Sequence, residues 1–402
     1  MIKPASKPDY SRNAELNNFF NSLGEYCAKL EPCTVFITVI DNLAMLNSAY
    51  GHMGADNIIG KLCQKISLKN GATQRVADNC IVILQPGVNV EKNKAAANNL
   101  KKIISQFGLK SGRESAAHIS STVNYVEVSD FAKTPEEIFA RLYAETGNRR
   151  NYSDEFPQTS RKALRAQMSL ANEIYEALHN NRLQLAYQPL IEAKSGKLHS
   201  YECLLRIIDE HGKSSSAGTF IHVAEKMGII ENIDLYVLDM VMDRLEADKE
   251  IKLSFNLSNL SIGNAAWVKR FFERATAQIA RRVTVEITET AAMLDLASTA
   301  YFIAKLQETG AQVALDDFGS GYTSFRQIRS LSLDYVKIDG SLIKDITTNH
   351  HNQLLVKSLL EFLQGLKLKT VAEFVDSADT AKFLINCGVD YMQGNYFGEA
   401  RI

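Results

Sequence analysis

Seven short runs in the C-terminal half of the sequence each end on a polar residue that could bind a metal ion or carry a proton, and six of these runs are strongly apolar. In chain order the polar residues are Glu202, Asn256, Glu286, Asp316 together with Asp317, Lys337, Glu373 and Gln393. Successive positions lie 54, 30, 30, 21, 36 and 20 residues apart, about the length of one or two strand–helix units. Repeated units of this kind form a parallel sheet covered by helices, and if the sheet closes as a (β/α)₈ barrel these side chains meet at one face.

Four of these residues, Glu202, Asn256, Glu286 and Asp316, offer hard oxygen ligands. Such ligands favour Mg²⁺ or Mn²⁺, and Asp317 adds a carboxylate for a second ion. Two ions about 3.5–4 Å apart can hold both the attacking and the leaving oxygen of an in-line displacement at phosphorus. The eight histidines show no HxxxH spacing, which disfavours a zinc site. The pattern therefore predicts metal-dependent chemistry at phosphorus.

Further residues could act beside the metal ligands. Lys337 could orient the attacking water or neutralise charge on the phosphoryl group, and its structural alternative is an ion pair with a neighbouring Asp. Glu373 could bind metal or water, and Gln393 could position either one. The segment 314–324 carries two glycines after its strand, as a flexible active-site loop would need. Glu289 either anchors that loop or is a solvated loop residue.

Composition and charge limit the class of protein. The chain has 402 residues, which suggests two or three domains, and a formal net charge of −1, which gives no overall field to attract a nucleic acid polymer. No run of 18 apolar residues exists, so we expect no membrane span, and the first 20 residues lack the apolar stretch of a signal peptide. The six cysteines are scattered without CxxC pairs. We therefore expect a cytoplasmic protein with reduced thiols.

The two halves of the chain have different patterns. Apolar periodicity predicts helices at 12–30, 57–66, 93–107 and 135–144, and strands at 34–40, 80–84 and 119–128. This alternation suits one α/β domain with a central sheet, which we assign to 1–152. The polar segment 151–161 is typical of a linker, and an amphipathic helix at 162–179 leads into a first barrel strand at 183–190. We assign 153–182 to the linker and leading helix, and 163–402 to the barrel domain, about the usual size for this fold.

Eight short motifs in the C-terminal half resemble those of the EAL phosphodiesterase family in type, order and spacing. They are YQPL (187–190), ECLLR (202–206), FNLS (255–258), EITET (286–290), DDFGSGYTSF (316–325), VKIDGSLI (336–343), AEFVD (372–376) and QGNYF (393–397). The resemblance covers about residues 163–402 and implies a TIM-like (β/α)₈ barrel. It also implies that the domain uses Mg²⁺ or Mn²⁺ to hydrolyse cyclic di-GMP to linear pGpG.

The resemblance assigns roles to individual residues. It implies that the metal ligands are Glu202, Asn256, Glu286, Asp316, Asp317 and Glu373. The lysine that activates water corresponds to Lys337, and Gln188, Arg206 and Gln393 match positions in or next to the substrate site. From both lines of argument we expect the catalytic residues to be Glu202, Glu289, Asp317, Lys337 and Glu373.

The sequence departs from the family pattern at several positions. Cys203 replaces the middle Ala of the EAL signature. His222 stands where the family usually has Pro, Asp376 replaces a Glu, Asn395 replaces an aromatic or similar residue, and Ala400 replaces a Pro. These changes bear on substrate affinity more than on the metal chemistry.

The N-terminal half resembles a GGDEF diguanylate cyclase domain that has lost its chemistry. The segment 47–56 (NSAYGHMGAD) resembles the family's NDxYGHxxGD, and Asn47 and Asp56 match the pair that reads guanine. The signature itself is replaced by ADNCI at 77–81, and Val39 stands in place of a metal-binding Asp. Phosphoryl transfer needs positioned cations, so we expect no cyclase activity. Asn47 and Asp56 either serve capping and turn roles or bind GTP in a sensing pseudo-enzyme.

The product-inhibition motif of that family, RxxD, is absent as well, since Leu68 and Gly71 stand at its ends. Our interpretation is a cyclic di-GMP phosphodiesterase preceded by a non-catalytic, regulatory cyclase-like domain. The alternative is a cyclic di-GMP receptor that signals through a protein partner, and receptors of this family tend to lose metal ligands. The family resemblance also implies a homodimer.

Overall fold

The computed structural model describes residues 14–66, 71–107, 117–147, 161–209, 211–319 and 325–402. The chain separates into two compact units, residues 1–175 and 176–402, and each is described by itself. Most of the predicted linker 151–161, the residue Leu68 and part of the loop 314–324 lie outside the described residues.

The first unit is built on a four-stranded sheet in the order β2-β3-β1-β4, with every neighbouring pair antiparallel. Its strands are β1 (Cys33–Ile40), β2 (Ala72–Ala77), β3 (Cys80–Pro86) and β4 (Ser121–Val128). Its helices are α1 (Ala14–Lys29), α2 (Leu43–Tyr50), α3 (His52–Lys65), α4 (Val90–Phe107) and α5 (Pro135–Gly147). All eight residues of β1 are buried, as expected for a β-branched run in the centre of a sheet.

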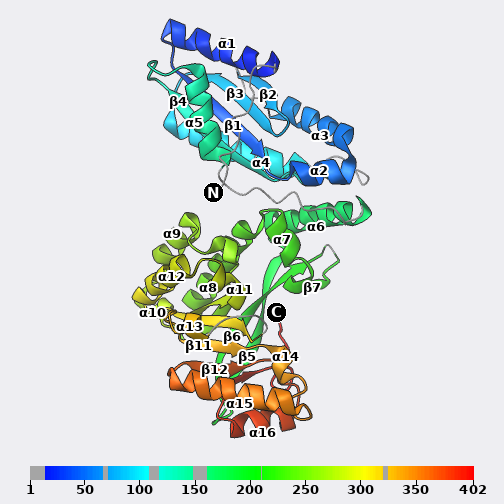
Figure 1. Ribbon diagram of the computed structural model, residues 1–402, viewed down its shortest axis with the longest axis vertical. Helices are drawn as coiled ribbons and strands as arrows, with labels where there is room; N and C mark the ends of the chain where they lie inside the picture. Colours follow the sequence, from blue (N-terminus) through cyan, green and yellow to red (C-terminus); the bar gives the residue numbers. More distant parts are fainter. Residues whose placement is uncertain (1–13, 67–70, 108–116, 148–160, 210, 320–324) are drawn as a thin grey trace. The chain divides into compact units, whose positions relative to one another are not determined.

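One face of this sheet packs against α1 and α5 (Figure 1). Apolar residues of α1, among them Leu16 and Phe19, meet Phe139 of α5 over Val35 and Ile37 of β1. The predicted strands and helices are therefore present in this unit, whereas α2 and β2 were not predicted. The β2 sequence ATQRVA does not alternate between apolar and polar residues, and most of its residues are half-buried. It forms a strand mainly because it pairs with β3.

The second unit is a closed eight-stranded barrel with helices around it (Figure 1). The sheet order is β5-β13-β12-β11-β10-β9-β8-β6, and the pairing of β5 with β6 closes the barrel. A short strand, β7, pairs antiparallel with the end of β6. The strands are β5 (Leu183–Glu192), β6 (Leu198–Ile208), β7 (Ser214–Ser216), β8 (Leu253–Asn256), β9 (Val283–Thr288), β10 (Gln312–Phe318), β11 (Tyr335–Ile338), β12 (Lys369–Ala372) and β13 (Tyr391–Gln393). The predicted α/β class with a C-terminal TIM-like barrel is confirmed at this level.

The expectation of an all-parallel barrel is wrong for one strand. From β6 through β13 the neighbouring barrel strands are parallel, but β5 is antiparallel to both β6 and β13. The cause is local, because only residues 193–197 separate β5 from β6. A parallel neighbour would need a crossover of a dozen or more residues, so this short connection forces a hairpin.

Helices occupy the connections between barrel strands. They are α7 (Ile221–Lys226), α8 (Ile230–Ala247), α9 (Ala265–Arg274), α10 (Ala277–Ala280), α11 (Glu289–Leu294), α12 (Leu296–Glu308), α13 (Phe325–Ile328), α14 (Gly340–Ile343), α15 (His350–Gly365) and α16 (Ala378–Asn386). The helix α6 (Arg161–His179) precedes the first barrel strand, and the division between the two units falls within it. Two short 3₁₀ turns span Ala217–Thr219 and Asn259–Ser261. Trp267 of α9 is fully buried and stacks on Phe271, with ring centroids 5.2 Å apart.

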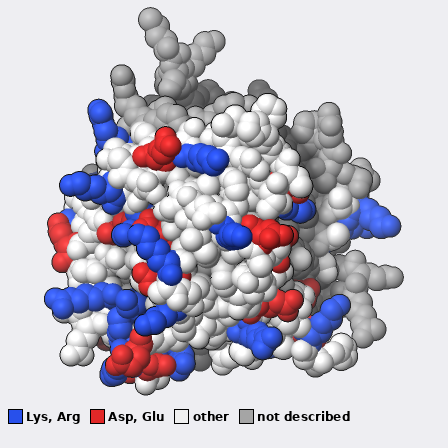
Figure 2. All heavy atoms as spheres, turned by 90° about the horizontal axis from the view of Figure 1, so that it is seen from below, with Lys and Arg blue, Asp and Glu red and all other residues white. Residues whose placement is uncertain are grey.

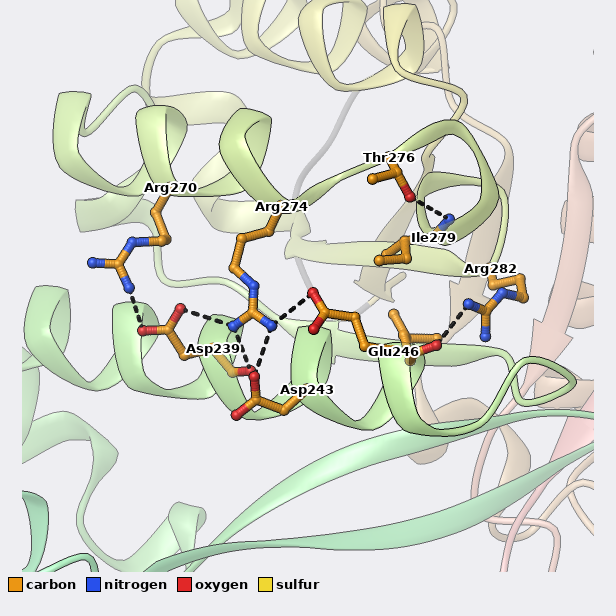
Figure 3. Close-up of polar contacts among 9 residues, drawn as sticks. Asp239, Asp243, Glu246, Arg270, Arg274, Thr276, Ile279 and Arg282 are labelled. Atoms are coloured by element: carbon orange, nitrogen blue, oxygen red, sulfur yellow. Dashed lines mark hydrogen bonds and ion pairs between the residues drawn. The ribbon is translucent and has the colours of Figure 1, made fainter.

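Helices α8 and α9 are also joined by an arginine–carboxylate network (Figure 3). The Arg274 guanidinium lies 2.7 Å from Asp243 and 2.8 Å from Glu246, and it also contacts Asp239. Arg270 makes a 2.7 Å ion pair with the same Asp239. Because single surface pairs contribute little and a network around one guanidinium contributes more, Arg274 fixes the packing of α9 on α8.

Charge on the visible surface is mixed. On the face seen in Figure 2, basic and acidic side chains of the described residues are interspersed, in keeping with the formal net charge of −1. Within the described ranges, no helix is long and apolar enough to cross a membrane.

Candidate active site

A buried ammonium group stands among four carboxylates inside the barrel. Lys337 Nζ lies 2.7 Å from Glu286 Oε2, 2.8 Å from Glu373 Oε1, 3.0 Å from Asp316 Oδ1 and 3.3 Å from Glu202 Oε2. Only 3% of the Lys337 side chain is exposed. These five residues are separated by up to 171 positions in the sequence, so only the closed barrel brings them together.

Parallel register explains why the side chains converge. Asn256, the last residue of β8, pairs with Glu286 of β9, and Ala314 of β10 pairs with the same Glu286. Lys337 is next to last in β11, and Glu373 directly follows β12. Since neighbouring parallel strands end at the same rim, their polar terminal residues lie close together.

Glu202 differs from the expected strand-end position. It lies in the middle of β6, which continues to Ile208 instead of ending at this residue. The longer strand is possible because the residues beyond Glu202 pair with β5 and β7, outside the parallel part of the barrel.

Side-chain amides hold the Glu202 carboxylate in place. Asn256 Nδ2 donates to Oε1 at 2.9 Å, and Gln393 Nε2 donates to Oε2 at 2.6 Å. Gln393 Nε2 also lies 3.1 Å from Gln188 Oε1, and Gln188 Nε2 lies 3.4 Å from the carbonyl oxygen of Gly398. The amide of Asn256 therefore uses its nitrogen for Glu202, which leaves its oxygen as the ligand atom that the sequence predicts.

The protonation of the cluster follows from burial and from the single ammonium. Burial alone would raise the pKa of Glu202, but Lys337 and the two amide donors hold that pKa below its ordinary value. Burial and the Glu202 charge raise the pKa of Glu286 well above its ordinary value. Burial raises the pKa of Glu373 to about 8, against the lowering effect of Lys337. Burial would lower the pKa of Lys337, but the surrounding carboxylates raise it well above the ordinary value.

A second group of carboxylates overlaps with the first. Ligand oxygens of Asp316, Asp317 and Glu373 lie within 4.8 Å of one another, a spacing that could hold a metal ion. Burial and the neighbouring Asp316 raise the pKa of Asp317 to about 6. The backbone of Asp317 has a φ of +57°, and its N–H donates to Asp316 Oδ1 at 3.0 Å. Such strain persists only where the surroundings impose it, and it is frequent at functional sites.

The donor set fits hard divalent cations. It consists of carboxylate oxygens and one amide oxygen, without thiolate or imidazole, which suits Mg²⁺ or Mn²⁺ better than Zn²⁺. Four carboxylates contact the Lys337 ammonium and Asp317 adjoins two of them, so the five carboxylates and one ammonium carry a formal charge of −4 when all are ionised. Burial is the main cause of the raised pKa values of Glu286, Glu373 and Asp317, and neighbouring carboxylates raise them further. Divalent cations would compensate the negative charge of the ionised groups.

Glu289 lies next to the glycine segment that follows β10. It is 3% exposed, and its Oε2 accepts a hydrogen bond from the Gly319 backbone N–H at 2.9 Å. This contact favours the anchoring role over a solvated loop residue. Residues 320–324, the remainder of that loop, lie outside the described residues.

Arg206 is not joined to the carboxylate cluster by any hydrogen bond or ion pair among the described residues. It lies four positions beyond Glu202 on the same strand, and its Nη1 donates to the neighbouring Leu205 carbonyl at 3.1 Å. Its predicted substrate role remains a prediction.

A pocket of about 550 Å³ adjoins the cluster. Asn256 and Asp317 line it, together with His222 and Glu225 of α7 and Asp234 of α8. Glu225 Oε1 accepts a hydrogen bond from Ser258 Oγ at 3.0 Å. The pocket is the space next to the cluster into which a ligand larger than a phosphate could extend.

Asp234 is a residue that the motif analysis did not single out. It is 5% exposed, its Oδ2 accepts from the Ser258 backbone N–H at 3.3 Å, and burial raises its pKa to about 7. A signal was available in the sequence, because Asp234 falls on the apolar stripe of α8 between Ile230 and Leu238. A carboxyl group on the buried face of a helix requires an explanation.

Of the positions that depart from the family pattern, His222 lines the pocket and is highly exposed. Its Nδ1 lies 3.6 Å from Glu225 Oε2. Asp376 and Asn395 are exposed, and Cys203 is buried with a free thiol.

In the first unit, the predicted guanine-reading residues are only partly free. Asp56 Oδ1 makes a 2.9 Å ion pair with Arg75 Nη2, and the Arg75 guanidinium also donates to the Asp78 carbonyl oxygen. Asn47 lies near the end of α2, where its carbonyl oxygen accepts from the Gly51 N–H at 2.8 Å.

The positions that the resemblance assigns to lost metal carboxylates lie in the sheet of the same unit. The tight β2–β3 turn contains only Asp78 and Asn79, and Val39 pairs with Cys80 across the sheet, both buried. Asp41 is half-buried and accepts a hydrogen bond from Thr122 Oγ1 at 3.1 Å, and partial burial raises its pKa to about 6.

Comparison with known proteins gives the family of the second unit. A model of the EAL domain matches residues 171–400. The chain is similar to the cyclic di-GMP phosphodiesterase PdeF of Escherichia coli (30% identity over 245 residues), covering 59% of this chain and 32% of PdeF. It spans between 30% and 54% of the length of the curated relatives considered.

Solved structures agree with the fold. The phosphodiesterase PaMucR in complex with c-di-GMP matches with a TM-score of 0.54 and 28% identity, covering 58% of this chain and 97% of that chain. The S helix–GGDEF–EAL structure of Vibrio cholerae LapD, bound to c-di-GMP, covers 96% of this chain and 95% of that chain with a TM-score of 0.53 and 17% identity. At that identity the second match concerns the fold alone.

The Lys337 ammonium gives a stability prediction. Lys337→Met leaves four buried carboxylates without their cation, so we expect the metal-free protein to lose about 3–5 kcal/mol of unfolding free energy. Thermal unfolding in EDTA measures this loss, and added Mn²⁺ should raise the melting temperature of the variant. Lys305→Met, which removes an exposed ion pair with Glu308 on α12, is the matched control and should change little. A Lys337→Met protein that melts with the wild type in EDTA would contradict the prediction.

Proposed function

Because the chain belongs to the EAL domain family, we propose that it hydrolyses cyclic di-GMP to linear pGpG in a reaction that depends on Mg²⁺ or Mn²⁺. The observation that carries the proposal is the cluster of four carboxylates around Lys337, from Glu202, Glu286, Asp316 and Glu373. Asn256, which is hydrogen-bonded to Glu202, and Asp317, which is grouped with Asp316 and Glu373, add two further oxygen ligands. Relatives of the chain are named as cyclic di-GMP phosphodiesterases, which supports the same substrate.

The proposed metal ligands are those six residues. When bound, two divalent ions would polarise the phosphodiester and make water a better nucleophile at neutral pH. The excess negative charge of the cluster supports their binding, since five carboxyl groups face a single ammonium.

The chain's own residues then position the reactants. Lys337 would orient the attacking water and face the negative charge that develops at phosphorus. Gln393 and Gln188 would fix the orientation of Glu202, to which they are linked by hydrogen bonds. Glu289 would hold the start of the loop 314–324 through the Gly319 N–H. The water oxygen attacks phosphorus, the bond to the 3′-oxygen breaks, and the product carries a 5′-phosphate.

The pocket beside the cluster supports a dinucleotide substrate. Its 550 Å³ could take one nucleoside while the phosphodiester lies at the carboxylates. Asp234 and Glu225 present carboxyl groups there, and a carboxylate can accept hydrogen bonds from the N–H groups of guanine. Arg206 remains a proposed contact to the substrate.

The alternative function is a receptor that binds cyclic di-GMP and signals through a protein partner. Loss of metal ligands would favour it, but all six donors are present in this chain. Enzyme activity is therefore the function that we propose.

Glu202→Ala should abolish turnover, because it removes a proposed metal ligand. The same carboxylate also accepts hydrogen bonds from Lys337, Asn256 and Gln393. The assay is incubation with cyclic di-GMP and Mg²⁺ or Mn²⁺, followed by chromatography for pGpG. Glu273→Ala, an exposed glutamate of α9, is the matched control and should retain wild-type turnover. Wild-type protein that binds cyclic di-GMP but leaves it intact with either metal would establish the receptor function instead.

For the N-terminal part we propose a degenerate, regulatory GGDEF-like domain over 1–152, a linker and leading helix over 153–182, and the phosphodiesterase domain over 163–402. The fold match to LapD over most of the chain supports this division. The absence of carboxylates at Val39, Asn79 and Cys80 supports the lack of cyclase activity. The six cysteines are free thiols, in keeping with the proposed cytoplasmic location.

We further propose that GTP binds this domain loosely through Asn47 and Asp56 and changes the phosphodiesterase rate by about 5–150-fold, the usual range of coupling between sites. The measurement is hydrolysis rate against GTP concentration in the wild type and in Asp56→Ala, with cyclic di-GMP synthesis expected in neither. Arg75→Ala breaks the same ion pair but keeps the carboxylate, so it should preserve the response. Equal, flat curves for all three proteins would leave the domain a structural or dimerisation module.

We propose that the protein forms a homodimer, because its resemblance to the EAL family implies one. Light scattering should then give twice the chain mass of 44.7 kDa, and a mass of 44.7 kDa with and without cyclic di-GMP would refute it.

A further inference from the structure

Phe374 combines exposure and backbone strain next to the carboxylate cluster. It directly follows Glu373, its side chain is 66% exposed, and its backbone has a φ of +52°. A bulky residue other than glycine rarely adopts a positive φ, and an exposed phenyl ring gains nothing from burial. Phe374 at the rim of the site therefore has both an unfavourable backbone conformation and an exposed apolar ring.

The ring lies directly on the backbone of Gly340. A Cβ added to Gly340 would stand 2.1 Å from Cδ2 of Phe374, so only glycine allows this approach. Phe374 directly follows Glu373, whose carboxylate belongs with Asp316 and Asp317 to the group that could hold a metal ion.

The chain after Phe374 is fixed, which keeps the ring in this place. Val375 N–H donates to the Gln393 carbonyl at 3.0 Å, and the Val375 carbonyl accepts from Tyr396 N–H at 3.1 Å. A Cβ on Gly394 would stand 2.1 Å from the Val375 carbonyl oxygen, so the backbones pass in close contact. Strain that is imposed from both sides indicates a built feature of the site.

We propose that Phe374 is a stacking platform for one guanine base of the dinucleotide and sets substrate affinity. This inference rests on the proposed function. When the phosphodiester of the substrate lies at the carboxylate cluster, the attached guanine base extends over the rim of the site. The flat, exposed ring of Phe374 lies at this rim. Stacking on an aromatic side chain binds a base whether or not its edge is hydrogen-bonded.

The test is steady-state hydrolysis of cyclic di-GMP by the full chain with Mn²⁺. Phe374→Gly suits a positive φ, so the variant should fold at least as well as the wild type. Its KM should rise by about 5–150-fold while kcat stays within about twofold, as expected for lost base stacking. Phe374→Tyr keeps the ring and should keep the KM. Tyr301→Ala, which removes a 68% exposed aromatic ring of α12, is the matched control and should change neither constant.

A double-mutant cycle separates stacking from a general effect on structure. Gly340→Ala places a methyl group where the Phe374 ring lies, so it should raise KM in the wild-type background. In the Phe374→Gly background there is no ring to displace, and Gly340→Ala should then have no further effect.

Each outcome decides the inference. A KM for Phe374→Gly within twofold of the wild type, or a lower kcat at unchanged KM, overturns it while the proposed function stands. A KM change that follows loss of a dimer in light scattering also overturns it, because the ring is then a contact to a second copy. Wild-type protein that neither binds nor cleaves cyclic di-GMP overturns the proposed function and this inference together.

Discussion

The contact between Lys337 and its carboxylates is the interaction on which the barrel unit depends. Four carboxylates from four strands or their ends lie within 3.3 Å of one ammonium that water hardly reaches. Charges removed from water are tolerated only when they are paired and hydrogen-bonded, so each donor and acceptor around them is constrained. The amides of Asn256 and Gln393 meet this demand at Glu202, the most heavily bonded of the carboxylates.

This arrangement balances the charge only in part. One ammonium cannot neutralise five carboxyl groups, and burial together with the neighbouring carboxylates raises the pKa values of Glu286, Glu373 and Asp317. A protein that kept these groups for stability alone would do better with apolar side chains of similar size. The excess negative charge is understandable when the site is made for cations. Two of the five described non-glycine residues with positive φ, Asp317 and Phe374, also lie at this rim, where strain is maintained by the surrounding contacts.

The first unit has the opposite character. Its sheet places Val39 opposite Cys80, and both side chains are buried. This pair offers no oxygen ligand for a cation. Two polar contacts of this unit are the ion pair of Asp56 with Arg75 and the hydrogen bond that Thr122 donates to Asp41. The packing of β1 against α1 and α5 does not involve those polar residues, so the fold of this unit does not depend on them.

Local pattern was sufficient for much of this protein. Apolar runs that end on Asn256, Asp316, Lys337 and Gln393 identified both the barrel strands and the residues that meet at their ends, because strand-forming residues and terminal polar residues are both local properties. The tertiary structure alone decided the rest. The pairing of β6 with β5 and β7 placed Glu202 in mid-strand, and the closure of the barrel put Lys337 at the centre of the carboxylates instead of beside one of them. The burial of Asp234, the anchor at Glu289 and the strained, exposed ring of Phe374 depend on segments far apart in the chain, and no local pattern contains the geometry of such contacts.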